Sequence, residues 1–302
     1  MNFRNTSILS IGECMVELSS AGDNTYSMGF AGDTFNAAWY LRRLLPPIWE
    51  VSYFTALGID STSEDMIEFM KKSGINTSSI ERLSGKTAGL YMIQLNEGER
   101  SFSYWRDTSA ARQLAQDADR LDTAMQSAGI VIFSGITMAI LPPEGRNNLL
   151  GALTRARADG CTIVFDPNLR PHLWPDTSIM CTEISRAAKT ADIVLPSFDD
   201  EKTFFGDNTP EDTAKRYRDL GVGLVVVKNG VDEILVRDRD NDLLGFTPKR
   251  IEHPVDTTAA GDSFNAGFLS SLIAGDDIET AVRAGAALSA EVINHRGALV
   301  EV

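Results

Sequence analysis

The stretch of this chain best suited to chemistry is "DTTAAGDSFNAGF", residues 256–268. The apolar residues that follow Gly261 recur at helical spacing, so we expect a helix that begins near Asp262. Two small residues, Ala259 and Ala260, stand before that glycine and leave backbone N–H groups accessible. The first amides of a helix have no partner within it and lie at the positive end of its dipole, so they bind anions. The stretch therefore predicts an anion site.

Asp262 has an unusual place beside such a site, because a carboxylate next to an anion is unfavourable unless a proton donor is present. A hydroxyl that attacks a phosphoryl group is such a donor, and phosphoryl transfer uses a positioned carboxylate to accept its proton. The alternative is a plain helix cap, since Asp is common at that position. Asp256 and two threonines precede the small residues. That cluster is longer than a cap requires, which favours catalysis.

The composition excludes several classes of partner. The 302 residues carry a net charge of −14, with a pI of about 4.7 and no basic run, which argues against nucleic acid and anionic membranes. No apolar run is long enough to span a membrane, and the N-terminus lacks a signal-peptide pattern. Cys14, Cys161 and Cys181 are widely spaced, so neither disulfides nor zinc sites are expected. We expect a reduced, cytoplasmic protein.

Short β-branched runs alternate with helical patterns along most of the chain. Runs such as "TSILSIGE", "GIVIFSG" and "TIVFDPN" predict strands. The alternation predicts an α/β fold with a mainly parallel sheet covered by helices on both faces. Residues 14–31 and 86–108 instead predict successive strands, with a hairpin turn at "NEGER". We expect a main domain of residues 1–13, 32–85 and 109–302, and a small sheet from the other two segments lying over it.

The motifs resemble those of a known family. "DTTAAGDSFNAGF" is similar to the C-terminal signature of the ribokinase-like (PfkB) sugar kinases, with Ala259 where the family usually has glycine. "AGDTFNAAW", residues 31–39, fits their N-terminal signature. The resemblance implies a ribokinase-like three-layer α/β sandwich with a small β-sheet lid over a sugar site. It also implies that Asp262 is the catalytic base and that the anion hole is formed by Ala259, Ala260 and Gly261.

The first of the two similar stretches would bind the sugar rather than the phosphate, through Gly32, Asp33, Thr34 and Asn36. Both stretches are then glycine turns that lead into a helix, directed at the two ends of one reaction. We interpret their similarity as convergence on one local geometry, because the sequence around them does not repeat. A simple helix cap is an equally good interpretation of Asp33.

Two arginines indicate what kind of sugar binds. Arg106 lies in "SFSYWRD" and Arg170 in "FDPNLRPHLW", and arginine suits a carboxylate or phosphate, which it holds with two parallel hydrogen bonds. Taken singly, Arg106 is better interpreted as a solvated charge on a strand and Arg170 as part of a structural ion pair. Together with "IGECMVEL", "GLYMIQ" and "FSGITMAIL" they resemble the 2-keto-3-deoxygluconate kinase branch of the family. That branch implies phosphorylation of the terminal hydroxyl of a sugar acid held by Tyr91, Tyr104, Arg106 and Arg170.

The resemblance also implies ATP and Mg²⁺. The implied nucleotide-binding residues are Asn168, Arg170, Ser197, Lys228, Gly230, Ala259, Gly261 and Asn294, although "KNG" is also ordinary turn chemistry. Where many members of the family have an N-x-x-E segment linked to Mg²⁺, this chain has "PSFDDE". Asp200 is therefore a candidate for holding Mg²⁺ through water, and Asp256 a candidate for a monovalent cation such as K⁺. No Walker-type phosphate loop occurs in the sequence.

Other functions remain open. The same signatures fit a kinase for a neutral sugar such as fructose or ribose, or a non-catalytic sugar-binding protein on the same fold. A Rossmann dehydrogenase is excluded, because no G-x-G-x-x-G follows the first predicted strand. The sequence leaves open whether the acid derives from gluconate or galactonate. One face of the predicted lid sheet would be exposed, and we expect it to pair with a second copy in a homo-oligomer.

Overall fold

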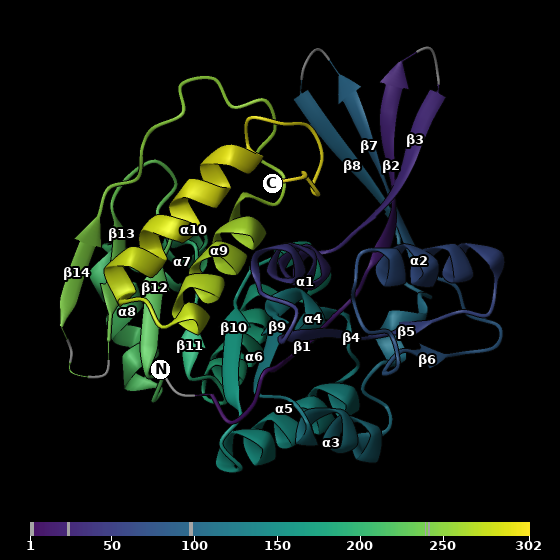
Figure 1. The fold of residues 1–302 in the computed structure, drawn as a ribbon, viewed down its shortest axis with the longest axis horizontal. Coiled ribbons are helices and arrows are strands. Elements are labelled where there is room, and N and C mark those ends of the chain that lie inside the picture. Colours follow the sequence, from purple (N-terminus) through teal and green to yellow (C-terminus); the bar gives the residue numbers. More distant parts are fainter. Residues whose placement is uncertain (1–2, 23–24, 97–98, 239, 241) are drawn as a thin grey trace.

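One eight-stranded sheet forms the centre of the protein. The computed structural model describes residues 3–22, 25–96, 99–238, 240 and 242–302 (Figure 1). From edge to edge the sheet contains β14 (Leu243–Phe246), β13 (Ile234–Arg237), β12 (Leu224–Val227), β11 (Ile193–Val194), β10 (Thr162–Asp166), β9 (Ile130–Ser134), β1 (Ser7–Ile11) and β4 (Glu50–Phe54). The pairs from β12 to β4 are parallel, and β13 and β14 are antiparallel. The predicted, mainly parallel sheet is confirmed.

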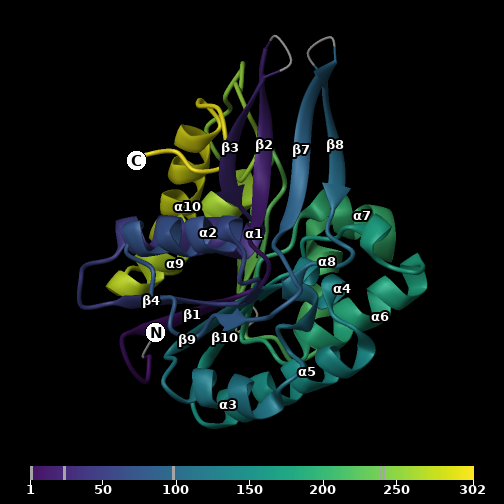
Figure 2. The same cartoon turned by 90° about the vertical axis from the view of Figure 1, so that its right-hand side faces the viewer.

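Helices cover both faces of this sheet, which makes the three layers of a sandwich. One face carries α1 (Asp33–Leu44), α2 (Ser61–Lys72), α9 (Ala260–Ala274) and α10 (Ile278–Val292), and the other carries α3 (Ala118–Gln126), α4 (Gly135–Ile140), α5 (Pro143–Ala158), α6 (Thr177–Ala188), α7 (Phe198–Phe205) and α8 (Pro210–Asp219) (Figure 2). Two short 3₁₀ turns lie at Ala110–Gln113 and Pro171–Leu173. Among the described residues no helix is both long and apolar enough to cross a membrane.

The alternation of side chains along each strand produces two cores. In β9, Ile130 and Ile132 pack in the core beneath α1 and α9. Val131 and Phe133 point the other way and join the core beneath α5 and α6. Successive strand residues face opposite sides of a sheet, so a run that is apolar throughout must be covered on both. This explains why the inner positions of β9, β10, β11 and β12 are apolar.

A second, four-stranded sheet stands beyond one end of the central sheet (Figures 1 and 2). Its order is β3 (Thr25–Ala31), β2 (Met15–Gly22), β7 (Gly89–Asn96) and β8 (Glu99–Trp105). β2 pairs with β7 in parallel, and each forms an antiparallel hairpin with its other neighbour. Residues 14–31 and 86–108, which were predicted to form successive strands, therefore supply the strands of one sheet. Two residues of the predicted "NEGER" turn, at 97 and 98, lie outside the described residues.

One predicted strand is divided in the structure. The stretch "EVSYFTALG" forms β4 and then β5 (Ala56–Leu57), which pairs with β6 (Glu81–Arg82) instead of with the central sheet. Thr55 lies between the two pieces and is fully buried. The chain thus leaves the central sheet here and leads towards α2.

Candidate active site

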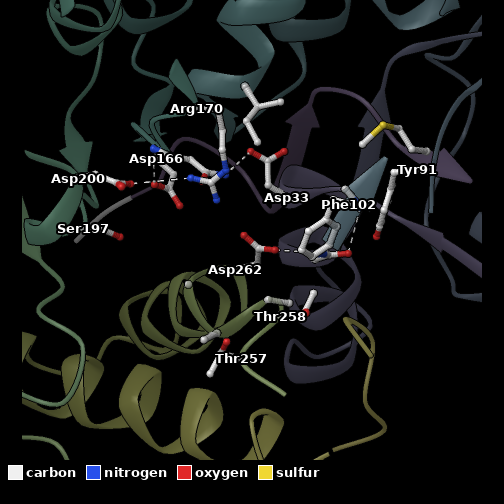
Figure 3. A pocket seen from close by; sticks show the side chains of 18 of the residues that line it. Asp33, Tyr91, Phe102, Asp166, Arg170, Ser197, Asp200, Thr257, Thr258 and Asp262 are labelled. Carbon is white, nitrogen blue, oxygen red and sulfur yellow. Dashed lines mark hydrogen bonds and ion pairs between the residues drawn. The ribbon is translucent and has the colours of Figure 1, made fainter. Parts of the chain in front are cut away.

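A cavity of about 670 Å³ lies where the second sheet faces the carboxyl ends of the central strands and the N-termini of α1 and α9 (Figure 3). Ligands of open α/β sheets bind at this end of the strands. The cavity brings together most of the residues predicted from the sequence, which are Gly32, Asp33, Asn36, Tyr91, Tyr104, Arg106, Asn168, Arg170, Ser197, Asp200, Lys228, Ala259, Ala260, Gly261 and Asp262. They come from at least seven separate elements, so only the folded chain assembles them.

The N-terminus of α9 begins slightly earlier than the sequence indicates. Its N-cap is Ala259, whose φ of 59° is in the left-handed region, and no side chain caps the helix. Asp262 is the third helical residue, so it is not the N-cap. The N–H of Ala260 donates to the carbonyl of Thr257, which corrects the expectation that this amide is open. The backbone N–H groups of Gly261 and Asp262 are therefore the donors of the first turn that remain for an anion.

Asp262 is joined to the first glycine motif. The Nδ2 atom of Asn36 donates a hydrogen bond of 2.8 Å to Oδ2 of Asp262, so the two similar stretches of sequence meet in the cavity. Burial, followed by the nearby charge of Asp33, raises the pKa of Asp262 to about 8, although the Asn36 bond opposes the rise. A carboxylate with a pKa near the working pH is well suited to accept a proton.

Asp33 is held by a different amide. It is the first residue of α1, whose N-cap is Gly32, so it is not a simple cap. Its Oδ2 accepts a hydrogen bond of 2.8 Å from Nδ2 of Asn168, and its Oδ1 accepts one from the N–H of Thr34. Burial raises the pKa of Asp33 in spite of these bonds. The side chains of Asp33 and Asp262 both point into the cavity (Figure 3).

Lys228 brings a positive charge to the N-terminus of α9. Its Nζ lies 3.2 Å from Oδ2 of Asp166 and 3.1 Å from Oδ1 of Asn265. Gly261 lies directly beside this ammonium, since a Cβ atom added to the glycine would be 3.5 Å from the Nζ of Lys228. An ammonium beside unpaired helix amides forms a site for an anion such as phosphate. Asp166 and Asn265, which orient the lysine, were not singled out from the sequence.

Aromatic side chains of the second sheet form one wall of the cavity. The rings of Tyr91, Phe102 and Tyr104 lie with centroids 6.0–6.4 Å apart. The Tyr91 hydroxyl donates to the carboxylate of Glu17 on β2. His172 approaches the Tyr104 ring at 5.9 Å. Phe102 and His172 also line the cavity, and the sequence had pointed to neither. Phe102 lies in a hairpin, where aromatic residues are common, and His172 lies in the 3₁₀ turn after β10.

Arg106 is not a surface charge. Its side chain is 6% exposed and forms an ion pair with Glu13, which is 1% exposed. Both Nε and Nη2 of the arginine donate to Oε2 of the glutamate, and the Ser109 hydroxyl donates to the other carboxylate oxygen at 2.6 Å. These bonds use the Nε side of the guanidinium, so the Nη1 edge is not engaged by Glu13. Glu13 belongs to "IGECMVEL", but its role was not predicted.

Arg170 lies more openly at the opposite end of the cavity. Its Nη1 donates to the carbonyl of Leu169 at 2.7 Å and lies 3.9 Å from Oδ2 of Asp200. Figure 3 shows the contact between Arg170 and Asp200. Burial is the main reason that the pKa of Asp200 is raised. Ser197, the N-cap of α7, forms an isolated parallel β-bridge with Lys228 through the backbone. These contacts place the "PSFDDE" segment beside the anion site.

A second cavity, of about 360 Å³, adjoins the first. Both are lined by Ser197, Lys228, Thr257, Ala260 and Gly261. The rest of the second cavity is largely apolar and includes Gly230, Ile251, Pro254, Phe264, Ala286 and Ile293. A flat aromatic base fits such a slot, and a phosphate chain would reach the shared wall. The N-terminus of α9 thus separates two compartments.

Three predicted residues are not in either cavity. The Thr34 hydroxyl is bound to the hydroxyl of Tyr53 at 3.0 Å in the core, and the residue is 3% exposed. The Nδ2 of Asn294 donates back to the carbonyl of Ala290. Asp256 accepts hydrogen bonds from the N–H groups of Thr258 and Gly297 and so fixes the loop before α9. Within the described residues, no group of three or more His, Cys, Asp or Glu side chains is arranged to hold a metal.

The fold and the two adjoining cavities agree with the sugar-kinase class that the sequence predicted. The chain belongs to the PfkB family of carbohydrate kinases, which it matches over residues 5–301. It is 39% identical over 299 residues to a protein of Dickeya dadantii named 2-dehydro-3-deoxygluconokinase, with 97% of this chain and 96% of the relative covered. A protein of the same name from Escherichia coli K12 is 36% identical, with 97% and 96% covered.

Solved structures agree with the fold. A PfkB protein from Polaromonas has a TM-score of 0.85 and 27% identity, with 96% of both chains covered. A putative ribokinase II of E. coli, solved in complex with ATP and Mg²⁺, has a TM-score of 0.84 and 20% identity, with 97% of this chain and 94% of that chain covered. The predicted ribokinase-like architecture is therefore confirmed.

Proposed function

We propose that the protein is an ATP-dependent kinase of 2-keto-3-deoxygluconate (2-dehydro-3-deoxy-D-gluconate) that transfers phosphate to the terminal hydroxyl and forms the 6-phosphate. Full-length relatives at 36–39% identity carry the corresponding name. The observation that carries the proposal is the position of Asp262, a carboxylate with a raised pKa at the helix N-terminus between the two cavities. A protein that only binds sugar has no use for a base at that point.

In the proposed reaction, one group of the chain accepts a proton and others stabilise negative charge. Asp262 accepts the proton of the attacking hydroxyl, which lies in the larger cavity. The amides of the first turn of α9 and the Nζ of Lys228 stabilise negative charge on the phosphoryl group as it passes between the cavities. Catalysis of this kind depends mainly on positioning and electrostatic stabilisation. MgATP supplies the phosphoryl group.

The second cavity is the proposed nucleotide site. Its apolar lining fits an adenine ring, while Ser197, Lys228 and Gly261 face both cavities and fit a triphosphate that reaches the shared wall. Gly230, with a φ of 55°, forms the turn after Lys228. Asn168 and Arg170 line the larger cavity and would approach the nucleotide from that side. We no longer include Asn294 among the nucleotide-binding residues, because its side chain donates back to the carbonyl of Ala290 in the preceding helix.

The larger cavity is the proposed site of the sugar acid. The open-chain substrate would lie against Tyr91 and Tyr104, with its hydroxyls near Gly32, Asp33 and Asn36. Arg106 and Arg170 supply the positive charge that a carboxylate requires in a protein of net charge −14. We leave Thr34 out, because its hydroxyl is bound within the core.

The finer ionic requirements are also proposals. Asp200 lies at the edge of the larger cavity and is a candidate for binding Mg²⁺ through water. Asp256 orders the loop that precedes α9, where a monovalent cation such as K⁺ would act on the conformation of the anion site.

The described cysteines are free, in keeping with the reducing cytoplasm. We also propose a homo-oligomer formed through the second sheet.

A coupled assay of ADP release tests the proposed activity. Purified protein is given MgATP and a panel of substrates: 2-keto-3-deoxygluconate, its galactonate-derived counterpart, fructose and ribose. We expect turnover with a keto-deoxy sugar acid, and a loss in kcat of at least about 100-fold in Asp262→Asn, because the base is removed. Stabilisation by sugar without any turnover would instead support the non-catalytic binding protein, and undiminished turnover in the variant would refute the role of Asp262.

Replacing Arg106 distinguishes an acid substrate from a neutral one. Arg106→Leu removes the charge that faces the cavity, so we expect kcat/KM for the sugar acid to fall by about 10- to 100-fold, from the value of a hydrogen bond to a charged group. A neutral sugar should lose much less. Because this change leaves Glu13 buried without its partner, Glu13→Gln/Arg106→Leu is the folding control. Equal losses for acid and neutral sugars in both proteins would contradict the assignment.

A further inference from the structure

Asn36 is the only described side chain that links the two glycine motifs by a direct hydrogen bond between side chains. Its Nδ2 donates to Oδ2 of Asp262 at 2.8 Å, and its Oδ1 accepts from the N–H of Gly32 at 3.3 Å. The residue is 4% exposed. A carboxylate accepts and a backbone N–H donates, so the two partners together fix the orientation of the amide. The side chain is therefore held at both ends.

We infer that Asn36 is a positioning residue for the reaction: it favours the ionised form of the Asp262 carboxylate and leaves Oδ1 as the oxygen that takes the proton. The inference rests on the proposed kinase function and changes the role given to Asn36, from a sugar contact to a residue that acts through the base. A hydrogen bond to a charged acceptor is stronger than one to a neutral acceptor. Asn36 thus favours the form of Asp262 that is active.

The charges around Asp262 explain why such a donor is needed. Asp33 on α1 and Asp166 at the end of β10 both oppose ionisation, and burial acts in the same direction. Lys228, at the end of β12, favours ionisation but acts more weakly than the Asn36 hydrogen bond. Tyr40 is a further titratable neighbour, and its hydroxyl is bound to the carbonyl of Ala298. Without Asn36, Asp33 and Asp166 would still oppose ionisation of Asp262, and Lys228 is the weaker of the two described side chains that favour it.

The structure contains a matched control. Asn168 donates from Nδ2 to Oδ2 of Asp33 at 2.8 Å, which is the same chemistry on a carboxylate that is not the proposed base. Loss of Asn168 would make Asp33 easier to protonate and so would weaken its repulsion of Asp262. The two asparagines should therefore affect the base in opposite directions.

The experiment compares profiles of kcat/KM against pH, from about pH 5.5 to about 9.5, since these report the essential groups of the free enzyme. In Asn36→Ala we expect the acidic limb to move up by about one pH unit, as loss of a hydrogen bond to a charged group predicts. Activity should fall by about tenfold near neutral pH and recover at the alkaline end. Asp262→Asn should not recover at any pH. Asn168→Ala should not move the limb upward, because it weakens the repulsion between Asp33 and Asp262.

Asn36→Asp guards against a general loss of packing. It has nearly the same shape, cannot donate when ionised and adds a like charge, so its limb should move further than that of the alanine variant. Thermal melting establishes that each variant is folded. An unshifted limb in folded, active Asn36→Ala and Asn36→Asp would overturn the inference while leaving the kinase in place. An inactive wild-type protein would refute the proposed function and, with it, the role of Asn36.

Discussion

Asp262, the proposed base, has a position that suits the proposed reaction and lowers the stability of the fold. Burial and the neighbouring Asp33 raise its pKa from 3.8 to about 8. A carboxyl with a raised pKa in the folded state favours folding when protonated, and this contribution is lost as the pH rises through the folded-state pKa. The cost to stability therefore grows as the pH rises from about 3.8 to about 8, and it is complete at alkaline pH, where Asp262 is ionised in the folded protein.

The variant that abolishes activity should consequently be more stable. Asparagine resembles the protonated acid, so we expect Asp262→Asn to raise the Tm by a few degrees near pH 9. The gain should shrink towards pH 5, where the wild-type residue is itself protonated. Melting curves of both proteins across this range measure the effect. A Tm that falls by the same amount at every pH would indicate lost packing instead.

Within the first glycine motif, the residues that line the cavity and the one that does not differ in their position around the helix. Asp33 and Asn36 lie three residues apart on α1 and both face the cavity. Thr34 lies about 100° further around the helix and points into the core, where it binds Tyr53. The sequence motif predicts the same role for the residues of this glycine turn, whereas their places in the first turn of α1 separate them.

The partners of the charged groups were not predictable in the same way. Glu13 and Arg106 are 93 residues apart in the chain, and no local pattern connects them. A buried arginine needs a buried acid, so the sequence implies that a partner exists without identifying it. Asn294 was misplaced for a related reason, because the direction of a side chain at a helix end depends on contacts that the sequence does not display.

At the scale of elements, the N-terminus of α9 combines an exposed turn with a strained residue. Ala259 has a φ of 59°, a conformation that costs a residue with a Cβ about 1–2 kcal/mol. Glycine adopts it freely, which agrees with its usual presence at this position in the family that the sequence resembles. The alanine that stands here in place of the family's usual glycine therefore carries an unfavourable backbone conformation.

Ala259→Gly should relieve that strain. After allowance for the greater freedom of glycine in the unfolded chain, we expect a net gain of about 0.5–1 kcal/mol and a Tm higher by roughly 2–4 °C for each kcal/mol. Ala260→Gly is the matched control, since Ala260 is the first helical residue and glycine there should not stabilise the protein. Equal melting temperatures for the two variants would argue against strain at residue 259.

Elements with a strong period were predicted well, and short ones were not. The helical patterns that became α1, α2, α5 and α8 have apolar spacing together with proline or glycine near an end, and such signals are local. By contrast, β11 contains only Ile193 and Val194, and β5 pairs away from the central sheet. The length of these strands depends on where their neighbours end, which is a property of the assembled sheet.

At the scale of the whole molecule, the second sheet has two unlike faces. Tyr91 and Tyr104 face the cavity, so the alternation along each strand places Trp105 and Met28 on the opposite side. Trp105 is 58% exposed and Met28 57% exposed. Large apolar side chains gathered on one face of a protein commonly mark an interaction surface. A second copy of the same sheet presents the same residues, so we propose that it is the partner.

Changing this face should therefore dissociate the protein. We expect sedimentation equilibrium to report an oligomer for the wild type and monomers for Met28→Lys/Trp105→Lys, because lysine opposes close pairing of apolar surfaces. Ile48→Lys is the control, since Ile48 is 72% exposed and lies outside the sheet. A monomeric wild type, or an oligomer that survives the double change, would refute pairing through the second sheet.

The partition between the two cavities has a thermodynamic consequence. Gly261 and Lys228 face both sides, so whatever occupies one compartment alters the wall against which the other ligand binds. Linkage makes this influence reciprocal: the factor by which nucleotide changes the affinity for sugar equals the factor by which sugar changes the affinity for nucleotide. A phosphorylated product and a fresh ATP would both direct anionic groups at one ammonium. Each should therefore weaken the other's hold, and departure of the product should favour the next round of turnover.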